Sequence, residues 1–265
     1  MPKPLRVLLT NDDGIDAEGL HALHRSVTQV FHTHFIDQPY EIFVVAPDRG
    51  RSECGHSIET STSLKVTTRE PDWFAVNGTP VDCIRVAQYA LKLRPDVVFS
   101  GINAGANLGV NLMVSGTFAA AREASLLGIP ALAASHYRRP DVDRTWDHAP
   151  TWLADTVSNF VAQCVASTDR PDPENSEAAR IRPAFLWNVN LPAITPRREG
   201  ESFAVPPAIT CDVDRCPIDR DGSVAADGNV RFDLDFHGRA REAGRDVDQC
   251  FGGKITVSEL FPHCF

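Results

Sequence analysis

Short apolar runs that alternate with stretches of helical periodicity constrain this chain more than any other feature. Leu5–Leu9 is a mainly apolar run that stops at a polar loop, and apolar residues then recur at helical spacing from Leu20 to Phe31. The alternation continues in further apolar runs at Ile42–Ala46, Val97–Phe99 and Ala131–Ala134, with a helix predicted at 116–127. Strands that alternate with helices predict right-handed crossovers and a parallel sheet covered on both faces.

Two parts of the chain depart from this alternation. Residues 57–76 are rich in Thr and Ser with alternating apolar positions, which predicts short antiparallel strands, and Pro80 predicts a helix start. After a helix predicted at 150–167, the polar, proline-bearing stretch 169–182 predicts a loop. Strand-like runs follow at Phe185–Asn190, Val230–Phe236 and Ile255–Leu260.

These patterns predict an α/β fold with a doubly wound, mostly parallel sheet. We expect residues 1–168 to form the doubly wound core. We expect residues 169–265 to complete that core and to carry a smaller, appended β-rich region.

Charge and composition limit the partners of the chain. The formal net charge of −9, without any long Lys/Arg-rich run, argues against binding of nucleic-acid polymers. No apolar run approaches the roughly 20 residues that span a bilayer, and the N-terminus has no signal-peptide pattern. The seven cysteines include no Cys-x-x-Cys pair, which predicts reduced thiols rather than a zinc site or a disulfide framework. We therefore expect a cytoplasmic protein with neither a membrane nor a nucleic-acid partner.

Compact polar clusters follow three of the predicted strands: Asn11–Gly14, Arg51–Ser57 and Ser100–Asn103. In an open parallel sheet, ligands bind at the carboxyl ends of the strands, near the point where the strand order reverses. The predicted topology therefore brings clusters that are distant in sequence to one edge of the sheet.

Adjacent carboxylates dominate the first cluster. Asp12 and Asp13 would repel the pyrophosphate of a dinucleotide, and neither Gly-x-Gly-x-x-Gly nor a P-loop pattern occurs there. Paired carboxylates with a hydroxyl and a carboxamide nearby are hard oxygen donors, which favour Mg²⁺, Mn²⁺ or Ca²⁺. Taken alone, however, Asp-Asp-Gly is equally compatible with a simple turn that caps a helix.

A second candidate element is Ser115-Gly116-Thr117, which precedes a predicted helix. The start of a helix offers unpaired N–H groups and the positive end of a dipole, which suits a phosphate. The alternative is an ordinary helix cap at Ser115. Upstream, Gly and Asn recur in a pattern typical of a tight loop with an exposed backbone, at Gly101, Asn103, Gly105, Asn107, Gly109 and Asn111.

Several ordered motifs together resemble the SurE (stationary-phase survival protein) family of nucleotidases. The resemblance rests on Leu9–Ile15, Val45–Arg49 with Ser52, Gly78–Cys83, Ser100–Gly109, Ser115–Thr117 and Leu127–Ala133, and more weakly on Asn188–Pro192 and Asp246–Pro262. The sequence departs from the family pattern at Val110–Val114, where acidic residues and a tyrosine are usual. It departs again at Ala121–Ser125, where alanine replaces glycine, so substrate preference is the property most open to change.

The resemblance implies a phosphomonoesterase that hydrolyses nucleoside 5′- and 3′-monophosphates by metal-activated water, with short polyphosphate as a further substrate in some members. It implies one divalent cation per subunit, Mg²⁺ or Mn²⁺, with Ca²⁺ able to occupy the site in crystals. Its metal ligands would be Asp12, Asp13, Ser52 and Asn103. It also implies a homodimer or homotetramer with exchanged C-terminal elements.

From this we expect Asp12, Asp13, Asn103 and Ser115 to be catalytic. The carboxylate held less tightly by the metal would accept the proton of the attacking water. Phosphate binding would fall to Asn11, Ser115, Gly116, Thr117 and His56. Asn11 would either orient phosphate or hold its loop, and His56 would be either a leaving-group acid or a structural hydrogen-bonding group.

Two alternatives stay open at the level of sequence. An aspartyl-phosphate phosphatase would also place acids after the first strand, although that chemistry usually needs two aspartates one residue apart. A non-enzymatic nucleotide-binding module is the other. We further expect an extended arm from about Glu199 to Asp248 to reach a neighbouring subunit, because this segment holds many apolar groups with little helical periodicity. A compact subdomain folded back on its own core is the alternative to that exchange.

Overall fold

A central β-sheet organises the computed structural model, which describes residues 3–52, 54–166, 184–217, 221–225, 227–233 and 235–261. Within these residues the sheet has nine strands in the order β10-β13-β7-β6-β5-β1-β2-β4-β3. In chain order they are β1 (Leu5–Thr10), β2 (Tyr40–Pro47), β3 (Val66–Glu70), β4 (Trp73–Val76), β5 (Val97–Asn103), β6 (Ala131–His136), β7 (Leu186–Leu191), β10 (Ala208–Thr210) and β13 (Ile255–Leu260).

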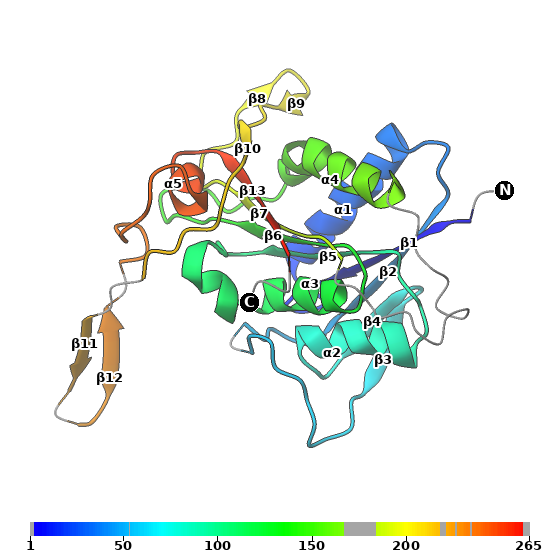
Figure 1. Cartoon of the computed structure of the whole chain (residues 1–265), viewed down its shortest axis with the longest axis horizontal. Coiled ribbons are helices and arrows are strands. Elements are labelled where there is room, and N and C mark those ends of the chain that lie inside the picture. The colour runs from blue at the N-terminus through cyan, green and yellow to red at the C-terminus, as the bar shows by residue number, and fades with distance from the viewer. Residues whose placement is uncertain are drawn as a thin grey trace.

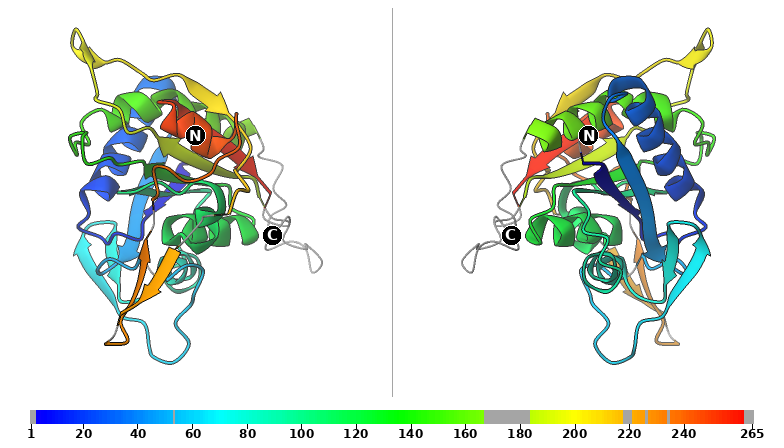
Figure 2. Two further views of the ribbon diagram at one scale, coloured as in Figure 1. Left: turned by 90° about the vertical axis from the view of Figure 1, so that its left-hand side faces the viewer. Right: turned by 90° about the vertical axis from the view of Figure 1, so that its right-hand side faces the viewer.

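Helices cover both faces of this sheet (Figures 1 and 2). The long helices α1 (Glu18–His34) and α4 (Ala149–Ala166) pack on one face. On the other lie α3 (Gly116–Leu126) and α2 (Pro80–Arg85), which continues into a π-helical turn at Val86–Ala90. The capping box between Thr79 and Asp82, together with Pro80 in the first turn, explains why α2 begins there. The predicted doubly wound α/β fold is confirmed.

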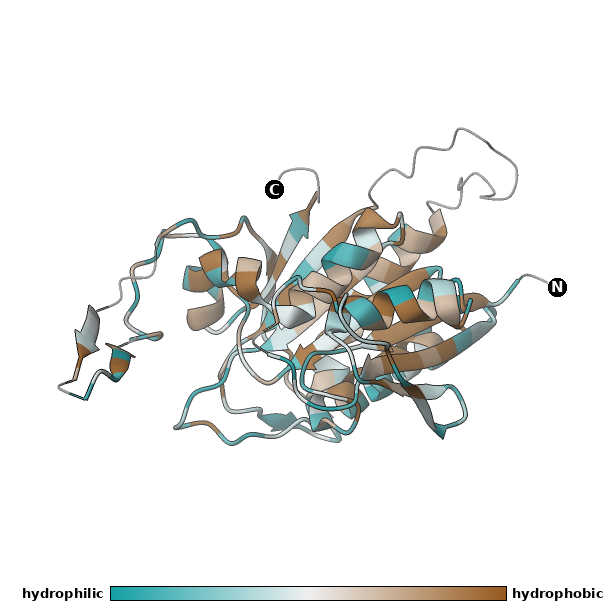
Figure 3. Ribbon diagram, turned by 90° about the horizontal axis from the view of Figure 1, so that it is seen from below, coloured by the Kyte–Doolittle hydropathy of each residue, from teal (hydrophilic) through white to brown (hydrophobic). Residues whose placement is uncertain are grey.

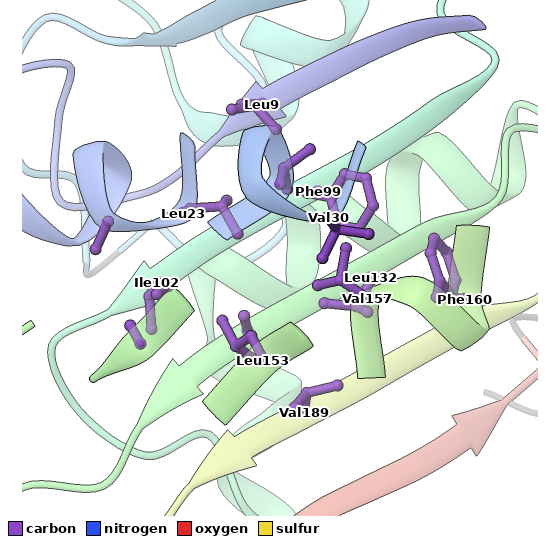
Figure 4. Close-up of a cluster of buried hydrophobic side chains, with 14 of the residues drawn as sticks. Leu9, Leu23, Val30, Phe99, Ile102, Leu132, Leu153, Val157, Phe160 and Val189 are labelled. Atoms are coloured by element: carbon purple, nitrogen blue, oxygen red, sulfur yellow. The ribbon is translucent and has the colours of Figure 1, made fainter. Parts of the chain in front are cut away.

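Alternate residues of the strands divide the core into two layers. Leu9, Phe99 and Leu132 point toward α1 and α4, where Figure 4 shows them against Leu23 and Val157. Leu8, Val98 and Ala133, one position away in each strand, point toward α2 and α3. Because both faces are buried, these strands read as continuous apolar runs, which is the pattern typical of a parallel sheet.

The C-terminal part of the chain contributes strands to the same sheet. β7 continues the parallel order beside β6, β13 is antiparallel to β7, and β10 is parallel to β13. α5 (Asp246–Phe251) precedes β13. The loop expected at 169–182 lies outside the described residues.

Two hairpins extend from this half of the molecule. β8 (Arg198–Glu199) and β9 (Ser202–Phe203) form one, which the side views of Figure 2 show protruding from the top. β11 (Asp221–Val224) and β12 (Val230–Asp233) form the other, which stands apart from the sheet in Figures 1 and 3. In the described part of the chain, no helix is long and apolar enough to cross a membrane.

Candidate active site

The order of strands in the sheet reverses between β1 and β5. The chain runs outward from β1 through β2 to the edge strand β3 and back to β4, then crosses to place β5 on the other side of β1. The register sets Leu9 opposite Phe99 and Thr10 opposite Ser100, so the loops that follow these two strands are neighbours. The backbone N–H of Ala104 donates to Oδ2 of Asp13 at 3.1 Å and joins the two loops. This is the position at which open α/β sheets bind ligands.

A cavity of about 410 Å³ lies at this switch point. Its lining includes the four predicted metal ligands and the predicted catalytic serine: Asp12, Asp13, Ser52, Asn103 and Ser115. Ala104, Ala106, Asn107, Asn111 and Val114 complete the described lining. The structure therefore brings together residues from three separate loops that the sequence had placed at strand ends.

Asn11 holds the loop after β1 in shape. Its Nδ2 donates to the carbonyl of Gly14 at 2.8 Å, and its Oδ1 accepts from the N–H of Gly14 at 3.2 Å. The neighbouring loop is attached through the N–H of Arg51, which donates to the carbonyl of Asp12 at 2.7 Å. Asn11 is absent from the described lining of the cavity, so its contacts match the loop-holding alternative.

Asp12 is 3% exposed and packs against the start of α3. The hydroxyl of Thr117 donates to its Oδ1. Gly116 permits this approach, because a Cβ there would lie only 2.9 Å from the Cβ of Asp12. Burial raises the pKa of Asp12 to about 6. The Thr117 hydrogen bond opposes this rise, and the charge of Asp13 adds to it.

The two adjacent carboxylates fit a cation. Burial also raises the pKa of Asp13 above its usual value, so the charged form of both acids is disfavoured here. A bound cation would offset the cost of burying these two negative charges. Among the described residues, no group of three or more His, Cys, Asp or Glu side chains could hold a metal, so a cation here would also need the Ser52 and Asn103 oxygens. Such an all-oxygen set suits a hard divalent ion.

Asn103 lies where β5 ends and is oriented by its own loop. Its Nδ2 donates to the carbonyl of Gly105 at 2.9 Å. This contact uses the donor end of the carboxamide, which leaves Oδ1 as the acceptor or ligand atom.

Ser115 is the N-cap of α3, and its hydroxyl accepts from the N–H of Phe118 at 3.1 Å. It also lines the cavity, so the N-terminus of α3, which suits an anion, lies at the cavity. Thr117 is fully buried, with its hydroxyl directed at Asp12. In this structure its observed partner is therefore a carboxylate of the site, which differs from the phosphate contact expected from the sequence.

His56 takes part in a network beside the site. Arg122 Nε donates to its Nδ1 at 2.9 Å, so its Nε2 carries the proton that reaches Glu123 at 3.0 Å. Burial disfavours the charge of Glu123, but hydrogen bonds from His56 and Arg85 hold its pKa below the usual value. Both ring nitrogens of His56 thus have protein partners, which is the arrangement of the structural alternative.

Asn107 and Asn111 also line the cavity, a role that their spacing did not predict. Asn107 is held by its N–H, which donates to Oδ1 of Asn190 at 2.9 Å, and by its Nδ2, which donates to Oγ of Ser135 at 2.7 Å. Both carboxamides can bind anionic oxygen through N–H groups. The spacing of Asn103, Asn107 and Asn111 was the available signal, and it indicated only a loop.

Comparisons with known proteins point to one family. Residues 7–207 match the family described as Survival protein SurE. The chain is 36% identical over 257 residues to a protein of Nostoc sp., which covers 97% of this chain and 99% of that protein. It is 35% identical over 269 residues to the 5′-nucleotidase SurE of Neisseria gonorrhoeae, covering 97% and 92%. The crystal structure of the SurE protein from Aquifex aeolicus aligns with a TM-score of 0.68 and 25% identity, over 97% of this chain and 93% of that one.

Proposed function

Since the chain belongs to the survival protein SurE family, we propose that it is a metal-dependent 5′-nucleotidase that hydrolyses phosphomonoesters of nucleosides. The observation that carries this proposal is the cavity at the β1–β5 switch point. There, two adjacent carboxylates, a hydroxyl and a carboxamide face the N-terminus of α3. A cation site beside an anion site is the arrangement that phosphoryl transfer requires.

The residues divide into two groups by chemistry. Asp12, Asp13, Ser52 and Asn103 would hold one divalent cation, which supplies Lewis acidity toward a phosphoryl oxygen and a lowered pKa for water. Ser115 and the positive N-terminal end of α3 would bind the remaining phosphate oxygens. Asp13 is more exposed than Asp12 and lacks the Thr117 contact, so we assign it as the base that accepts the proton of the attacking water.

The finer assignments extend this proposal. The oxygen ligands favour Mg²⁺ or Mn²⁺ as the working ion. We propose nucleoside 3′-monophosphates as further substrates, and short polyphosphate as a substrate to be tested with them. The described cysteines are all free thiols, which supports the proposed cytoplasmic location.

We also propose that residues 169–265 complete the catalytic core of residues 1–168 and carry an arm that joins subunits into a homodimer or homotetramer. The apolar residues of β7 are buried in the core of their own chain. The hairpin β11–β12 instead exposes Val224, Val230 and Phe232, with Phe232 63% exposed. Coverage by a second copy would remove this apolar surface from water.

The proposed function is tested by a phosphate-release screen of nucleoside monophosphates and polyphosphate, with and without added Mg²⁺ and Mn²⁺. Phosphate release from nucleoside 5′-monophosphates that depends on the added ion supports the proposal. Nucleotide binding without release would instead favour a non-enzymatic binding module, and trapping of a phosphoenzyme in acid would favour an aspartyl-phosphate mechanism.

A further inference from the structure

Asp246 connects the C-terminal part of the chain to a loop of the candidate site. It is the first residue of α5 and is 0% exposed. Its Oδ2 accepts from the N–H of Gly109 at 2.9 Å, across 137 positions of sequence. Its Oδ1 accepts from the N–H of Asp214 at 2.7 Å and from that of Val247 at 2.8 Å. One buried carboxylate thus joins three segments of the molecule.

The packing around Gly109 leaves little room for movement. Its φ of +55° lies in the left-handed region that favours glycine. A Cβ at this position would lie 2.5 Å from Nη2 of Arg239 and 3.2 Å from Cγ2 of Val247. Arg239 also donates to the carbonyl of Leu108 at 3.4 Å. The C-terminal part therefore contacts the backbone of this loop directly.

The loop in question, residues 104–115, supplies much of the cavity wall. Gly109 begins the 3₁₀ turn that ends at Val114, and Asn111 and Val114 of this turn line the cavity together with Ser115, which follows it. Asn107, at the near end of the loop, is fixed separately by β6 and β7. Between Asn107 and Ser115, the carboxylate of Asp246 holds the backbone at the first residue of the turn, beside the Arg239 contact with Leu108.

We propose that Asp246 is a positioning residue for the reaction, and that it holds the 104–115 loop so that its carboxamides and Ser115 face the phosphate of the substrate. This inference rests on the proposed function, because only a phosphate in the cavity gives the loop position a catalytic consequence. Asp246 itself is absent from the described lining of the cavity and acts through the backbone of Gly109. Displacement of a binding group by about 1 Å can cost on the order of a hundredfold in rate.

The substitution Asp246→Asn separates this role from general stability. Asparagine has nearly the same size but only one oxygen, and it presents an NH₂ group in place of the other. The oxygen that stays beside Asp214 and Val247 keeps two hydrogen bonds, whereas the NH₂ group then faces the N–H of Gly109. The variant is thus expected to lose chiefly the contact with the loop.

Asp214→Asn is the matched control. Asp214 is 1% exposed, and its carboxylate accepts from the N–H of Cys216 at 2.7 Å and from that of Glu242 at 2.8 Å. Both partners belong to the C-terminal part, so this substitution loosens the same region without removing the hydrogen bond to Gly109.

The experiment measures kcat and KM for AMP with Mn²⁺, amide hydrogen exchange in residues 104–115, and the melting temperature of both full-length variants. We expect Asp246→Asn to lower kcat by about tenfold to a hundredfold, with a smaller change in KM. It should speed exchange in the loop about fivefold or more. Asp214→Asn should lower the melting temperature about as much as Asp246→Asn does, yet keep kcat within about threefold of wild type.

Two results would overturn the proposal: an equal loss of kcat in both variants, or wild-type kcat and loop exchange in Asp246→Asn. If the wild-type protein releases no phosphate from AMP, the proposed function fails by itself. The exchange comparison between the two variants then still decides whether Asp246 holds the loop.

Discussion

Thr117 donates a hydrogen bond to Asp12 across 105 positions of sequence. This contact ties the first turn of α3 to the loop after β1, so the proposed anion-binding and cation-binding groups are held against each other. The hydroxyl also opposes the rise in the pKa of Asp12 that burial causes.

Removal of that hydroxyl should weaken metal binding. Thr117→Val keeps the shape of the side chain but removes the hydroxyl donor from the buried Asp12 carboxylate. Because loss of a hydrogen-bonding partner behind a metal ligand typically lowers metal affinity by about 10–100-fold, we expect Mn²⁺ affinity, measured by titration calorimetry, to fall about tenfold or more. Thr156→Val, at a buried threonine of α4, is the control and should leave the affinity unchanged. Equal affinities for both variants would show that the contact does not prepare the site.

Chelation should abolish phosphate release. The proposed site concentrates two carboxylates that a cation must neutralise before an anionic substrate can approach. Treatment with EDTA followed by dialysis is expected to remove activity toward AMP, and added Mn²⁺ or Mg²⁺ should restore it. Full activity in protein shown by elemental analysis to be metal-free would contradict the proposed chemistry.

Loss of a proposed ligand should remove catalysis while the fold persists. Asp13→Ala and Asn103→Ala are each expected to lower kcat on the order of 10³-fold, since several kcal/mol of transition-state stabilisation is lost. Asp16→Ala, an exposed acid three positions after Asp13, should stay within about twofold of wild type. Ser115→Ala should cost about tenfold to a thousandfold, because backbone donors remain at the start of α3. Near-normal turnover in the two ligand variants, with unchanged circular dichroism, would disprove the assignment.

A buried histidine pair should make stability depend on pH. His136 and His148 lie 2.8 Å apart through their Nε2 atoms. Burial, with the nearby charge of Arg138, lowers the pKa of His136 to about 3 and that of His148 to about 4. Below pH 6.5 the unfolded chain therefore binds more protons than the folded chain does. The contribution of the neutral histidine pair to the free energy of unfolding is complete above pH 6.5. It is lost as the pH falls toward 4, by about 3 kcal/mol for His148 alone.

Urea unfolding between pH 8 and pH 4 tests this expectation. The raised pKa of Asp12 acts in the opposite direction between about pH 6 and pH 4, so the comparison with a variant isolates the histidines. His148→Phe should flatten the fall in the free energy of unfolding with acid. An identical slope in wild type and variant would exclude the pair as its source.

The protruding hairpin should govern assembly. Phe232 and Val224 are exposed in the single chain, and their replacement by serine removes the apolar surface that a second copy would cover. Light scattering after size exclusion, over a hundredfold dilution, should show a dimer or tetramer for wild type and a smaller species for the double variant. A stable wild-type monomer that retains activity would refute the proposed arm exchange.

The sequence predicted the fold well where local pattern determines it. Apolar runs and helical periodicity located β1, α1, β2, β6 and α4, because a buried parallel sheet imposes these patterns directly. Strand ends and topology also placed Asp12, Ser52 and Asn103 at one cavity. The antiparallel position of β13 beside β7 has no local signal, since pairing partners depend on the whole fold.

Side-chain partners were harder to predict than positions. The direction of the Thr117 hydroxyl, the two protein partners of His56 and the contact between Asp246 and Gly109 all depend on tertiary packing. Each links residues that are far apart in sequence, and local spacing does not encode such pairs.

The position of β7 also affects how this protein is made. β6 emerges from the ribosome with β1–β5, but its outer edge pairs with β7, which follows some fifty positions later. Until then a strand that is fully buried in the finished fold presents unpaired N–H and C=O groups, the template on which chains pair with one another. Nascent or truncated chains that end before Leu186 are therefore expected to aggregate, even though they contain every residue proposed to touch the metal or the phosphate.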